Sequence, residues 1–385
     1  MTLPATPPLE IAELTVTVYR APVARPVRTA FGAMTDRPAV IVRARTADGA
    51  TGHGEIWCNF PTCGAEHRAR LVTSFLAPLV VGRRWRSPAE AFLELTRRAA
   101  RLALQAGEPG PLAQAIAGID IALWDLAAQL AGRPLWRLLG GEGDGRLPAY
   151  ASGINPDQAV DQALAARDAG YRAFKLKIGF GRATDLDNLA ALRAALGPEA
   201  PIAIDANQAW EPAEALAMSE ALAPFDPLWL EEPIAADSSL DDWRRLAEAS
   251  PIPLAGGENL RGEAQFEAAI EAGALRVFQP DAAKWGGISG CLPLARRVLA
   301  AGRRYCPHFL GGGIGLIASA HLLAAAGGDG LLEIDSNPNP LREGLAIPHP
   351  ALEDGRLVLS EAPGLGVRPG AEIERFAVPT IGEGA

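Results

Sequence analysis

The chain has 385 residues, of which 49% are hydrophobic and 21% are charged, as in a folded globular protein with room for one large domain and a smaller one. A net charge of −9 and the lack of any block rich in Lys and Arg argue against binding to nucleic acid or to an acidic membrane surface. We find no apolar stretch of about 18 residues and no signal-peptide pattern at the N-terminus, so we expect a cytoplasmic protein without a membrane segment.

The first part of the chain changes from a strand pattern to a helix pattern. Residues 10–57 alternate short apolar runs, such as AVIVRART, with turn signals such as ADG, and this predicts an antiparallel meander. Residues 63–140 have helical periodicity, as in AEAFLELTRRAARLALQ. We therefore predict an α+β domain.

A different pattern begins at about residue 147 and recurs roughly every 25 residues. Amphipathic helix-like stretches, such as DQAVDQALAARDAG, lead into short apolar runs such as YRAFKLKIG. This alternation indicates parallel strands joined by right-handed crossovers, and eight repeats suggest a closed barrel rather than an open sheet. After residue 340 we expect strand-like pieces and no helix, in a segment that could pack back on the first domain.

Polar side chains stand at the predicted carboxyl ends of these strands, where barrel enzymes carry their chemistry. Three acids, Asp205, Glu231 and Glu258, are separated by 26 and 27 residues, about one strand–helix unit each. Carboxylates gathered at neighbouring strand ends would repel one another unless a cation lay among them. Hard oxygen ligands, with no CxxC pair among the four cysteines, favour Mg²⁺ over zinc. The alternative is that each acid caps the helix that follows it.

Two further pairs suggest acid–base chemistry. Asp281 and His308 stand one strand apart, and a histidine oriented by a carboxylate is the usual general base near neutral pH. Lys175 and Lys177 project to one face of an apolar strand, because side chains alternate. If a divalent ion holds a substrate carboxylate beside them, Lys175 would then lower the pKa of Lys177 until Lys177 acts as a base, since each added positive charge disfavours the ammonium form. Solvated lysines at a strand edge are the alternative.

These groups together fit one reaction. Removing the proton α to a carboxylate builds a dianionic enediolate, which a metal ion and ammonium groups would stabilise as the charge develops. Lys177 and His308, from strands across the barrel, could approach the α-carbon from opposite faces.

An ordered set of motifs resembles the enolase superfamily and, within it, the mandelate racemase subgroup. The motifs are KLK at 175–177, IDAN at 204–207, LEEP at 230–233, GGEN at 256–259, QPDAAKWGG at 279–287 and CPHF at 306–309. The resemblance implies an α/β fold with a modified TIM barrel, (β/α)7β, and an N-terminal α+β capping domain. The implied domains are the capping domain at 1–140, the barrel at 141–345 and a C-terminal segment, 346–385, that returns to the capping domain.

The resemblance also implies roles for individual residues. One Mg²⁺ per subunit would be held by Asp205, Glu231 and Glu258. Lys177, supported by Lys175, would be the base for one face of the substrate, and His308 with Asp281 the base or acid for the other. Glu333 would hydrogen-bond the substrate carboxylate, although the glycine-rich insertion before it weakens this assignment. Further substrate contacts are predicted at Asn207, Phe31 and Trp57, the last two in loops that cover the site.

The resulting hypothesis is a Mg²⁺-dependent lyase or isomerase that acts on a small carboxylate. Dehydration of an acid sugar is our first choice, with Lys177 removing the α-proton and protonated His308 assisting departure of the β-hydroxyl. Racemisation or epimerisation, and cycloisomerisation of a sugar lactone, stay open as alternatives. We expect a homo-oligomer, and the sequence does not name the substrate.

The segment GGGIGLIASA, residues 311–320, suggests a rival function. Gly313-x-Gly315-x-x-Ala318, followed by Glu333 twenty residues after Gly313, superficially fits the fingerprint of an NAD-binding oxidoreductase. Only about 70 residues follow, too few for the usual nucleotide-binding unit. We instead interpret the glycines as a tight strand-to-helix turn whose N–H groups could bind a substrate anion. A non-catalytic barrel that serves as a scaffold is the third hypothesis.

Overall fold

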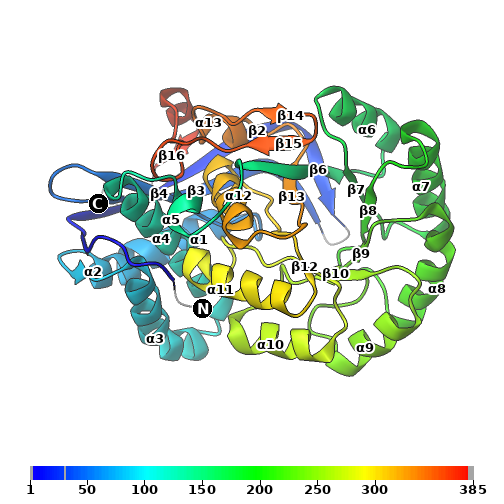
Figure 1. Cartoon of the computed structure of the whole chain (residues 1–385), viewed down its shortest axis with the longest axis horizontal. Helices are drawn as coiled ribbons and strands as arrows, with labels where there is room; N and C mark the ends of the chain where they lie inside the picture. Colours follow the sequence, from blue (N-terminus) through cyan, green and yellow to red (C-terminus); the bar gives the residue numbers. More distant parts are fainter. Residues whose placement is uncertain (1–2, 30–31, 380–385) are drawn as a thin grey trace.

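The computed structural model describes residues 3–29 and 32–379 and has an N-terminal sheet-and-helix unit beside a barrel (Figure 1). The N-terminal sheet has the order β16-β2-β3-β4, all antiparallel. Its strands are β2 (Glu13–Thr29), β3 (Gly32–Arg45), β4 (Thr51–Ile56) and, from the far end of the chain, β16 (Ala377–Val378). A second, two-stranded sheet pairs β1 (Leu9–Glu10) with β5 (Arg84–Trp85).

One face of the antiparallel sheet is covered by helices. They are α1 (Gly64–Leu71), a π-helical turn (Val72–Leu76), α2 (Ala77–Val80) and α4 (Pro109–Leu130). Helices α3 (Pro88–Ala106) and α5 (Leu135–Leu138) pack on α4. Contact between β4 and α4 requires glycine, because a Cβ at Gly54 would lie 1.9 Å from the carbonyl oxygen of Gly118. By length and composition α4 could cross a membrane, but 89% of its apolar window is buried inside the protein, as in a core helix.

Within the described residues, eight parallel strands, β6 to β13, form the barrel, and helices α6 to α12 surround them (Figure 1). The strands are β6 (Arg146–Ile154), β7 (Phe174–Lys177), β8 (Ile202–Asp205), β9 (Leu230–Glu231), β10 (Leu254–Gly256), β11 (Val277–Phe278), β12 (Arg304–Tyr305) and β13 (Leu332–Asp335). The helices are α6 (Ala159–Asp168), α7 (Arg182–Leu196), α8 (Pro212–Leu222), followed by a 3-10 turn (Ala223–Phe225), α9 (Leu240–Ala249), α10 (Gly262–Ala272), α11 (Gly287–Ala300) and α12 (Gly313–Ala326). This arrangement confirms the predicted (β/α)7β barrel with an α+β capping domain.

Aromatic and small side chains fill the interior of the barrel beneath the carboxyl ends of its strands. The rings of Tyr150 and Trp229 meet edge to face with centroids 5.5 Å apart, and alanines on neighbouring strands leave room for them. The first and last strands pair in parallel, β13 with β6. Between β12 and β13 the described residues have no ladder, and the Leu331 N–H donates instead to Sγ of Cys306 at 3.3 Å.

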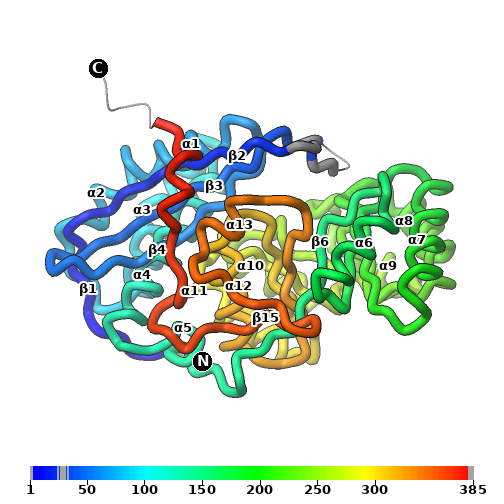
Figure 2. The backbone as a smooth tube through the Cα atoms, turned by 90° about the horizontal axis from the view of Figure 1, so that it is seen from above, coloured from blue at the N-terminus to red at the C-terminus, as the bar shows by residue number. Residues whose placement is uncertain are grey.

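The C-terminal segment does not follow the prediction entirely, because it contains a helix. Helix α13 (Pro340–Gly344) begins where the Asn339 side chain accepts the Leu341 N–H and Pro340 occupies the first turn. After it come β14 (Leu352–Glu353), β15 (Arg356–Val358), which pairs with β6, a 3-10 turn (Ala371–Phe376) and β16. Figure 2 shows this segment, in red, crossing the capping domain. The exact division of the chain near residues 140 and 345 stays a prediction.

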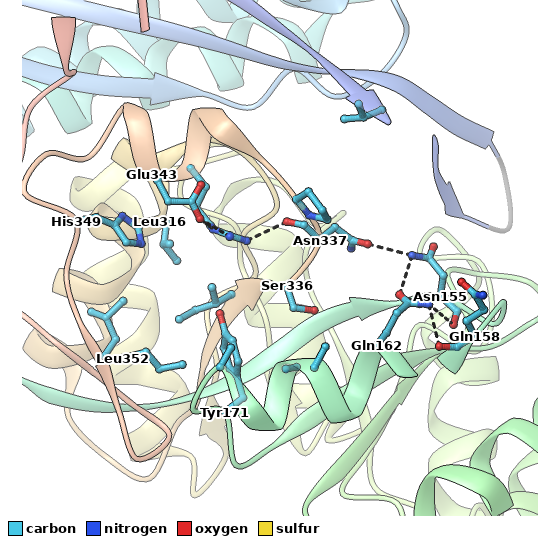
Figure 3. A pocket seen from close by; sticks show the side chains of 18 of the residues that line it. Asn155, Gln158, Gln162, Tyr171, Leu316, Ser336, Asn337, Glu343, His349 and Leu352 are labelled. Carbon is cyan, nitrogen blue, oxygen red and sulfur yellow. Dashed lines mark hydrogen bonds and ion pairs between the residues drawn. The ribbon is translucent and has the colours of Figure 1, made fainter. Parts of the chain in front are cut away.

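A cavity of about 1020 Å³ lies outside the barrel wall, where an eighth barrel helix would pack (Figure 3). Tyr171, Leu316 and Ile334 line one part of it, and Asn337 and Arg342 line another. None of the predicted catalytic or metal-binding residues lines this cavity. The chemistry must therefore be sought at the strand ends.

Candidate active site

The carboxyl ends of the barrel strands carry a row of charged side chains in strand order. They are Lys175 and Lys177 on β7, Asp205 on β8, Glu231 on β9, Glu258 after β10, Asp281 after β11, His308 after β12 and Glu333 on β13. Strand register aligns Lys177 with Asp205 and Asp205 with Glu231. All are buried except Glu258, whose side chain is 12% exposed. The chain has only three lysines, and the third, Lys284, also lies in this cluster.

Lys175 is a fixed cation at the base of the row. Its Nζ donates to both carboxylate oxygens of Glu231 at 2.8 Å and lies 2.7 Å from Oε1 of Glu333. Burial alone would lower the pKa of Lys175, but Glu231 and Glu333 raise it well above its ordinary value. Lys175 therefore remains an ammonium group that neutralises neighbouring carboxylates.

Lys177 contacts the next acid along the row. Its Nζ lies 2.5 Å from Oδ2 of Asp205 and donates to Oδ1 of Asn207 at 2.9 Å. Burial lowers the pKa of Lys177, Asp205 raises it and Lys175 lowers it, and the net direction is upward. Lys175 thus contributes to the pKa of Lys177 with the predicted sign, although Asp205 outweighs it here. The predicted lowering assumes a divalent ion at the neighbouring acids, and it stays a prediction.

The structure brings His308 and Asp281 together. Nδ1 of His308 lies 2.7 Å from Oδ2 of Asp281, whose other oxygen accepts the N–H groups of Ala283 and Lys284. On the opposite side of the ring, Nε2 lies 2.5 Å from Oε2 of Glu258. Burial would lower the pKa of His308, yet Glu258, Glu333 and the bond to Asp281 raise it well above 6.5. Asp281 thus orients the ring, and the neighbouring carboxylates favour its protonated form.

The three predicted metal ligands are engaged by basic groups. Lys175 lies between Glu231 and Asp205, at 3.6 Å from Oδ2 of Asp205, whereas Glu258 contacts His308 and, at 3.4 Å, Nζ of Lys284. Within residues 3–29 and 32–379, no three acidic, imidazole or thiol groups surround a common point as in a formed metal site. Whether the donor set fits a cation must therefore be judged from its chemistry and charge.

The charge of the cluster fits a divalent cation. Six carboxylates face four basic groups, which leaves an excess of two negative charges when all of these groups are ionised. The carboxylates are those of Asp205, Glu231, Glu232, Glu258, Asp281 and Glu333. The basic groups are those of Lys175, Lys177, Lys284 and His308. Without a cation, protons cancel part of this excess near neutral pH, because burial and Asp205 raise the pKa of Glu231 to about 7, and burial and Glu258 raise that of Glu232 to about 8. An all-oxygen donor set is the kind that Mg²⁺ prefers.

The backbone beside these acids adopts conformations that few residues tolerate. Asn207, Gln208 and Glu232 have φ values of 45°, 65° and 39°, in the left-handed region. Hydrogen bonds hold them there: the Asn207 N–H donates to Oδ1 of Asp205, and the Gln208 side chain donates to Glu232 at 3.0 Å. Strain of this kind concentrates where a site must hold its side chains in a fixed direction.

Several residues of the cluster escaped the sequence-based predictions. The Gln279 side chain donates to Glu231 at 2.7 Å, and Ser152 Oγ donates to Glu333 at 2.5 Å. Gln279 begins the QPD motif, which was a usable signal, whereas Ser152 lies in an ordinary strand sequence that gives none. Glu232, which the sequence places at the end of the same strand as Glu231 but to which no role was assigned, accepts the Asn259 amide at 2.9 and 3.0 Å.

The capping domain supplies one wall of the site. The Trp57 ring lies 4.7 Å from Nζ of Lys284, and the Trp57 N–H donates to the Ala283 carbonyl. Trp57 therefore lies beside the charged row, where a substrate would be covered. Phe31 lies outside the described residues.

The glycine-rich segment 311–315 binds a carboxylate of the protein itself. Glu55, on β4, accepts the N–H groups of Gly312 at 2.5 Å and Gly315 at 2.8 Å. The interpretation that these N–H groups bind a substrate anion is therefore wrong, because the carboxylate of Glu55 already occupies the helix N-terminus. The same contact leaves no place there for the pyrophosphate of a dinucleotide, and Glu333 is fully buried against Lys175 rather than free to bind a ribose.

Two family models cover most of the chain. Residues 11–140 match the mandelate racemase/muconate lactonizing enzyme N-terminal domain, and residues 158–373 match the enolase C-terminal-domain-like family. The chain belongs to this family. Its predicted membership of the enolase superfamily, mandelate racemase subgroup, is confirmed, and with it the predicted class of Mg²⁺-dependent enzyme chemistry.

Individual relatives agree with this assignment. A mandelate racemase/muconate lactonizing enzyme from Bordetella bronchiseptica RB50 is 54% identical, with a TM-score of 0.89 over 97% of this chain and 99% of that one. D-galactarolactone cycloisomerase of Agrobacterium fabrum is 35% identical over 71% of this chain and 75% of that protein. L-talarate dehydratase from Polaromonas sp. JS666, solved with Mg and L-glucarate, is 27% identical, with a TM-score of 0.81 over 96% of this chain and 98% of that one.

Proposed function

We propose that the protein is a Mg²⁺-dependent dehydratase of an acid sugar, which removes the proton α to the carboxylate and then expels the β-hydroxyl. One observation carries the proposal: Lys177 and His308 stand at opposite ends of the row of acids and contact Asp205 and Glu258, respectively. A substrate held beside those acids would have a basic group on either side of its α-carbon.

Asp205, Glu231 and Glu258 would hold one Mg²⁺ per subunit. Their oxygens and the excess negative charge of the cluster support this assignment. When bound, the ion supplies positive charge that offsets the negative charge developing on the substrate carboxylate. Lys175, an ammonium group between Glu231 and Glu333, adds fixed positive charge next to the same place.

The residues divide the proton transfers between them. Lys177, after giving up a proton, takes the α-proton as the α-C–H bond breaks. His308, held by Asp281 through Nδ1, donates its Nε2 proton to the β-hydroxyl as the C–O bond breaks and water leaves. The resulting enol becomes a 2-keto-3-deoxy acid. Each group then returns to its starting protonation state by exchange with water.

Substrate contacts complete the proposal. Asn207 lies beside Nζ of Lys177, and Trp57 lies over Lys284, so both would meet the polyhydroxy chain of a sugar acid. Phe31, outside the described residues, is proposed for the covering loop from the resemblance alone. Glu333 has its oxygens engaged by Lys175, Ser152 and the Phe309 N–H. From the resemblance we assign Glu333 a hydrogen bond to the substrate carboxylate. From its contact with Lys175 we assign it a second role, which is to hold the ammonium group of Lys175 in place.

Incubation of the purified enzyme with a library of aldonates and aldarates in D₂O tests the reaction. Formation of 2-keto-3-deoxy acids that depends on added Mg²⁺ supports dehydration. Deuterium at the α-carbon with inverted configuration and no loss of water would replace dehydration by racemisation or epimerisation. If no acid in the library exchanges its α-proton, the proposal fails.

Cycloisomerisation of a sugar lactone is the second candidate, favoured by the Agrobacterium fabrum relative. It would use the same two groups, one to remove the α-proton and the other to return a proton after the ring oxygen leaves. Aldarolactones belong in the same library, and conversion to an isomeric product of unchanged mass would favour this candidate. Dehydration lowers the mass by one water, so mass spectrometry separates the two.

We also infer a cytoplasmic homo-oligomer that acts on a small carboxylate and binds neither nucleic acid nor membrane. Its four cysteines, Cys58, Cys63, Cys291 and Cys306, are all free thiols, as is usual in a reducing compartment. Light scattering coupled to size-exclusion chromatography tests the assembly, where a mass of one 40.3 kDa chain would contradict it.

A further inference from the structure

The glycine-rich segment 311–315 joins the two domains at the start of α12. The carboxylate of Glu55, on the capping strand β4, is 2% exposed and accepts the N–H groups of Gly312 and Gly315. These are among the N–H groups that a helix leaves without partners in its first turn. A buried carboxylate of the capping domain thus fixes the first turn of a barrel helix.

Glycine is required in this segment by close contacts. A Cβ at Gly312 would lie 2.8 Å from Oε1 of Glu55, and a Cβ at Gly315 would lie 2.3 Å from the Phe309 ring. The glycines therefore admit the Glu55 carboxylate on one side and the Phe309 ring on the other.

The contact lies close to His308 along the chain. Phe309 follows His308 and donates its N–H to Oε2 of Glu333 at 3.1 Å, and the carbonyl of Leu310 accepts the Asn59 side chain at 2.7 Å. The peptide from 308 to 312 is consequently held by Glu333 in the barrel, by Asn59 and Glu55 in the capping domain, and by the Asn339 side chain, which donates to the Gly311 carbonyl at 2.8 Å. A shift of this peptide would move the imidazole of His308.

We propose that Glu55 is a positioning residue for His308, through which docking of the capping domain sets the place of the imidazole. This proposal rests on the proposed function, in which His308 donates a proton to the leaving β-hydroxyl. Displacing a reacting group by about 1 Å can cost on the order of 10²-fold in rate. Loss of the Glu55 carboxylate should therefore weaken the step at His308 more than the step at Lys177.

The test compares Glu55→Gln with a matched control, Asp125→Asn. Asp125 is a buried carboxylate of the same domain that also accepts two backbone N–H groups, those of His53 and Leu365, but it holds the C-terminal segment. We expect Glu55→Gln to slow dehydration by about 10- to 100-fold, to slow α-proton exchange in D₂O by less than about threefold, and to leave KM nearly unchanged. Asp125→Asn should not separate the two rates.

Equal losses of dehydration and exchange in Glu55→Gln, or the same separation in Asp125→Asn, would overturn the proposal. If Glu55→Gln does not fold, Asn59→Ala removes another contact without burying a new polar group and should separate the rates in the same direction by a smaller factor. If the wild-type enzyme exchanges no α-proton at all, the proposed function has failed. Amide hydrogen exchange of the peptide 306–318 then decides the positioning role alone, since it should lose protection in Glu55→Gln and keep it in Asp125→Asn.

Discussion

Buried charge is used differently in the active site and in the contact between the capping domain and the barrel. In the domain contact Asp120 is satisfied by neutral groups, the N–H and hydroxyl of Ser289, and beside it Asp125 accepts two backbone N–H groups, one of them from the C-terminal segment. A third acid there, Asp335, is matched by a single cation, Arg37. In the active site the acids contact lysines and an imidazolium instead, with acids in excess. The first arrangement is complete as it stands, and the second is poised to receive a cation and an anionic substrate.

This difference predicts opposite responses to substitution. Removing an acid from the domain contact leaves buried N–H groups without partners, which costs stability. Removing from the active site an acid that contacts no lysine or imidazole, such as Glu232, relieves repulsion, so that stability is kept. Substitutions in either region therefore test whether acids of the domain contact stabilise the fold and acids of the active site do not.

The largest effect is expected at the two ends of the acid row. Lys177→Ala and His308→Asn should each reduce turnover by about 10³-fold or more, because each removes a group that transfers a proton. His308→Asn should keep exchange of the α-proton with D₂O, because Lys177 is intact. Steady-state kinetics and proton NMR of the substrate measure both rates. Two variants with wild-type turnover would show that neither residue is catalytic.

The domain contact should respond to pH through His321. Nδ1 of this buried histidine accepts the backbone N–H of Trp136 at 3.0 Å, so the single ring proton is on Nε2 and points to the Leu365 carbonyl. A second proton, on Nδ1, would point at the Trp136 N–H and break that hydrogen bond. Burial lowers the pKa of His321 from 6.5 to about 4. The folded state therefore resists protonation, and stability that is complete above pH 6.5 is lost as the pH falls toward 4, by about 3 kcal/mol.

Denaturant unfolding of the wild type and of His321→Gln between pH 4 and 8 measures this loss. Glutamine offers both an acceptor and a donor but does not titrate in this range, so the variant should lose less stability in acid than the wild type. Parallel pH profiles for the two proteins would contradict the assignment.

Binding of Mg²⁺ should stabilise the protein through the active site alone. At a concentration one hundred times its Kd, a ligand that binds only the folded state adds about 2.7 kcal/mol. The thermal midpoint of protein freed of metal by EDTA should rise as Mg²⁺ is added. Glu231→Gln should abolish the rise, and Asp120→Asn, in the domain contact, should retain it. A rise of equal size in Glu231→Gln would place the ion elsewhere.

The sequence predicted the site better than the domain contact, for a physical reason. The acids recur at the spacing of one strand–helix unit, and this spacing alone assigns Asp205, Glu231 and Glu258 to neighbouring strand ends. Glu55 and Gly312 lie 257 positions apart, and no local pattern reports such a pair. The segment GGGIG therefore suggested an external anion, although its anion is a side chain of the same protein.

The electrostatics of Lys177 shows the same limit. Alternation along one strand placed Lys175 next to Lys177 in the prediction, but the opposing charge, Asp205, enters from the neighbouring strand in register. Whether Lys175 or Asp205 has the larger effect on the pKa of Lys177 depends on interatomic distances, which the sequence alone does not give. For helix α13 the signal was local and available, since Asn339 and Pro340 form a recognisable helix start.

In the domain contact, Asp125→Ala should lower the free energy of unfolding by about 2 kcal/mol or more. The N–H groups of His53 and Leu365 would both lose their acceptor, and each buried donor without a partner costs about 1–3 kcal/mol. Asp125→Asn, which keeps one carbonyl oxygen, should cost less. Thermal unfolding of both variants without Mg²⁺ measures the order, and an unchanged midpoint in Asp125→Ala would show that the two bonds do not hold the C-terminal segment.

The smallest effect, and the sharpest contrast with Asp125, is expected at Glu232. This acid is as well buried and accepts hydrogen bonds from Gln208 and Asn259, yet it belongs to the cluster with excess negative charge, and its pKa is raised to about 8 by burial and Glu258. Glu232→Gln keeps the shape and cannot ionise, so it lacks the repelling charge that Glu232 acquires as the pH rises through about 8. Without Mg²⁺ its stability should stay within about 1 kcal/mol of the wild type or exceed it. If Glu232→Gln lowers the free energy of unfolding as much as Asp125→Ala does, Glu232 stabilises the fold. The excess of acids would then be tolerated for function only at the residues that contact Lys175, Lys177 and His308.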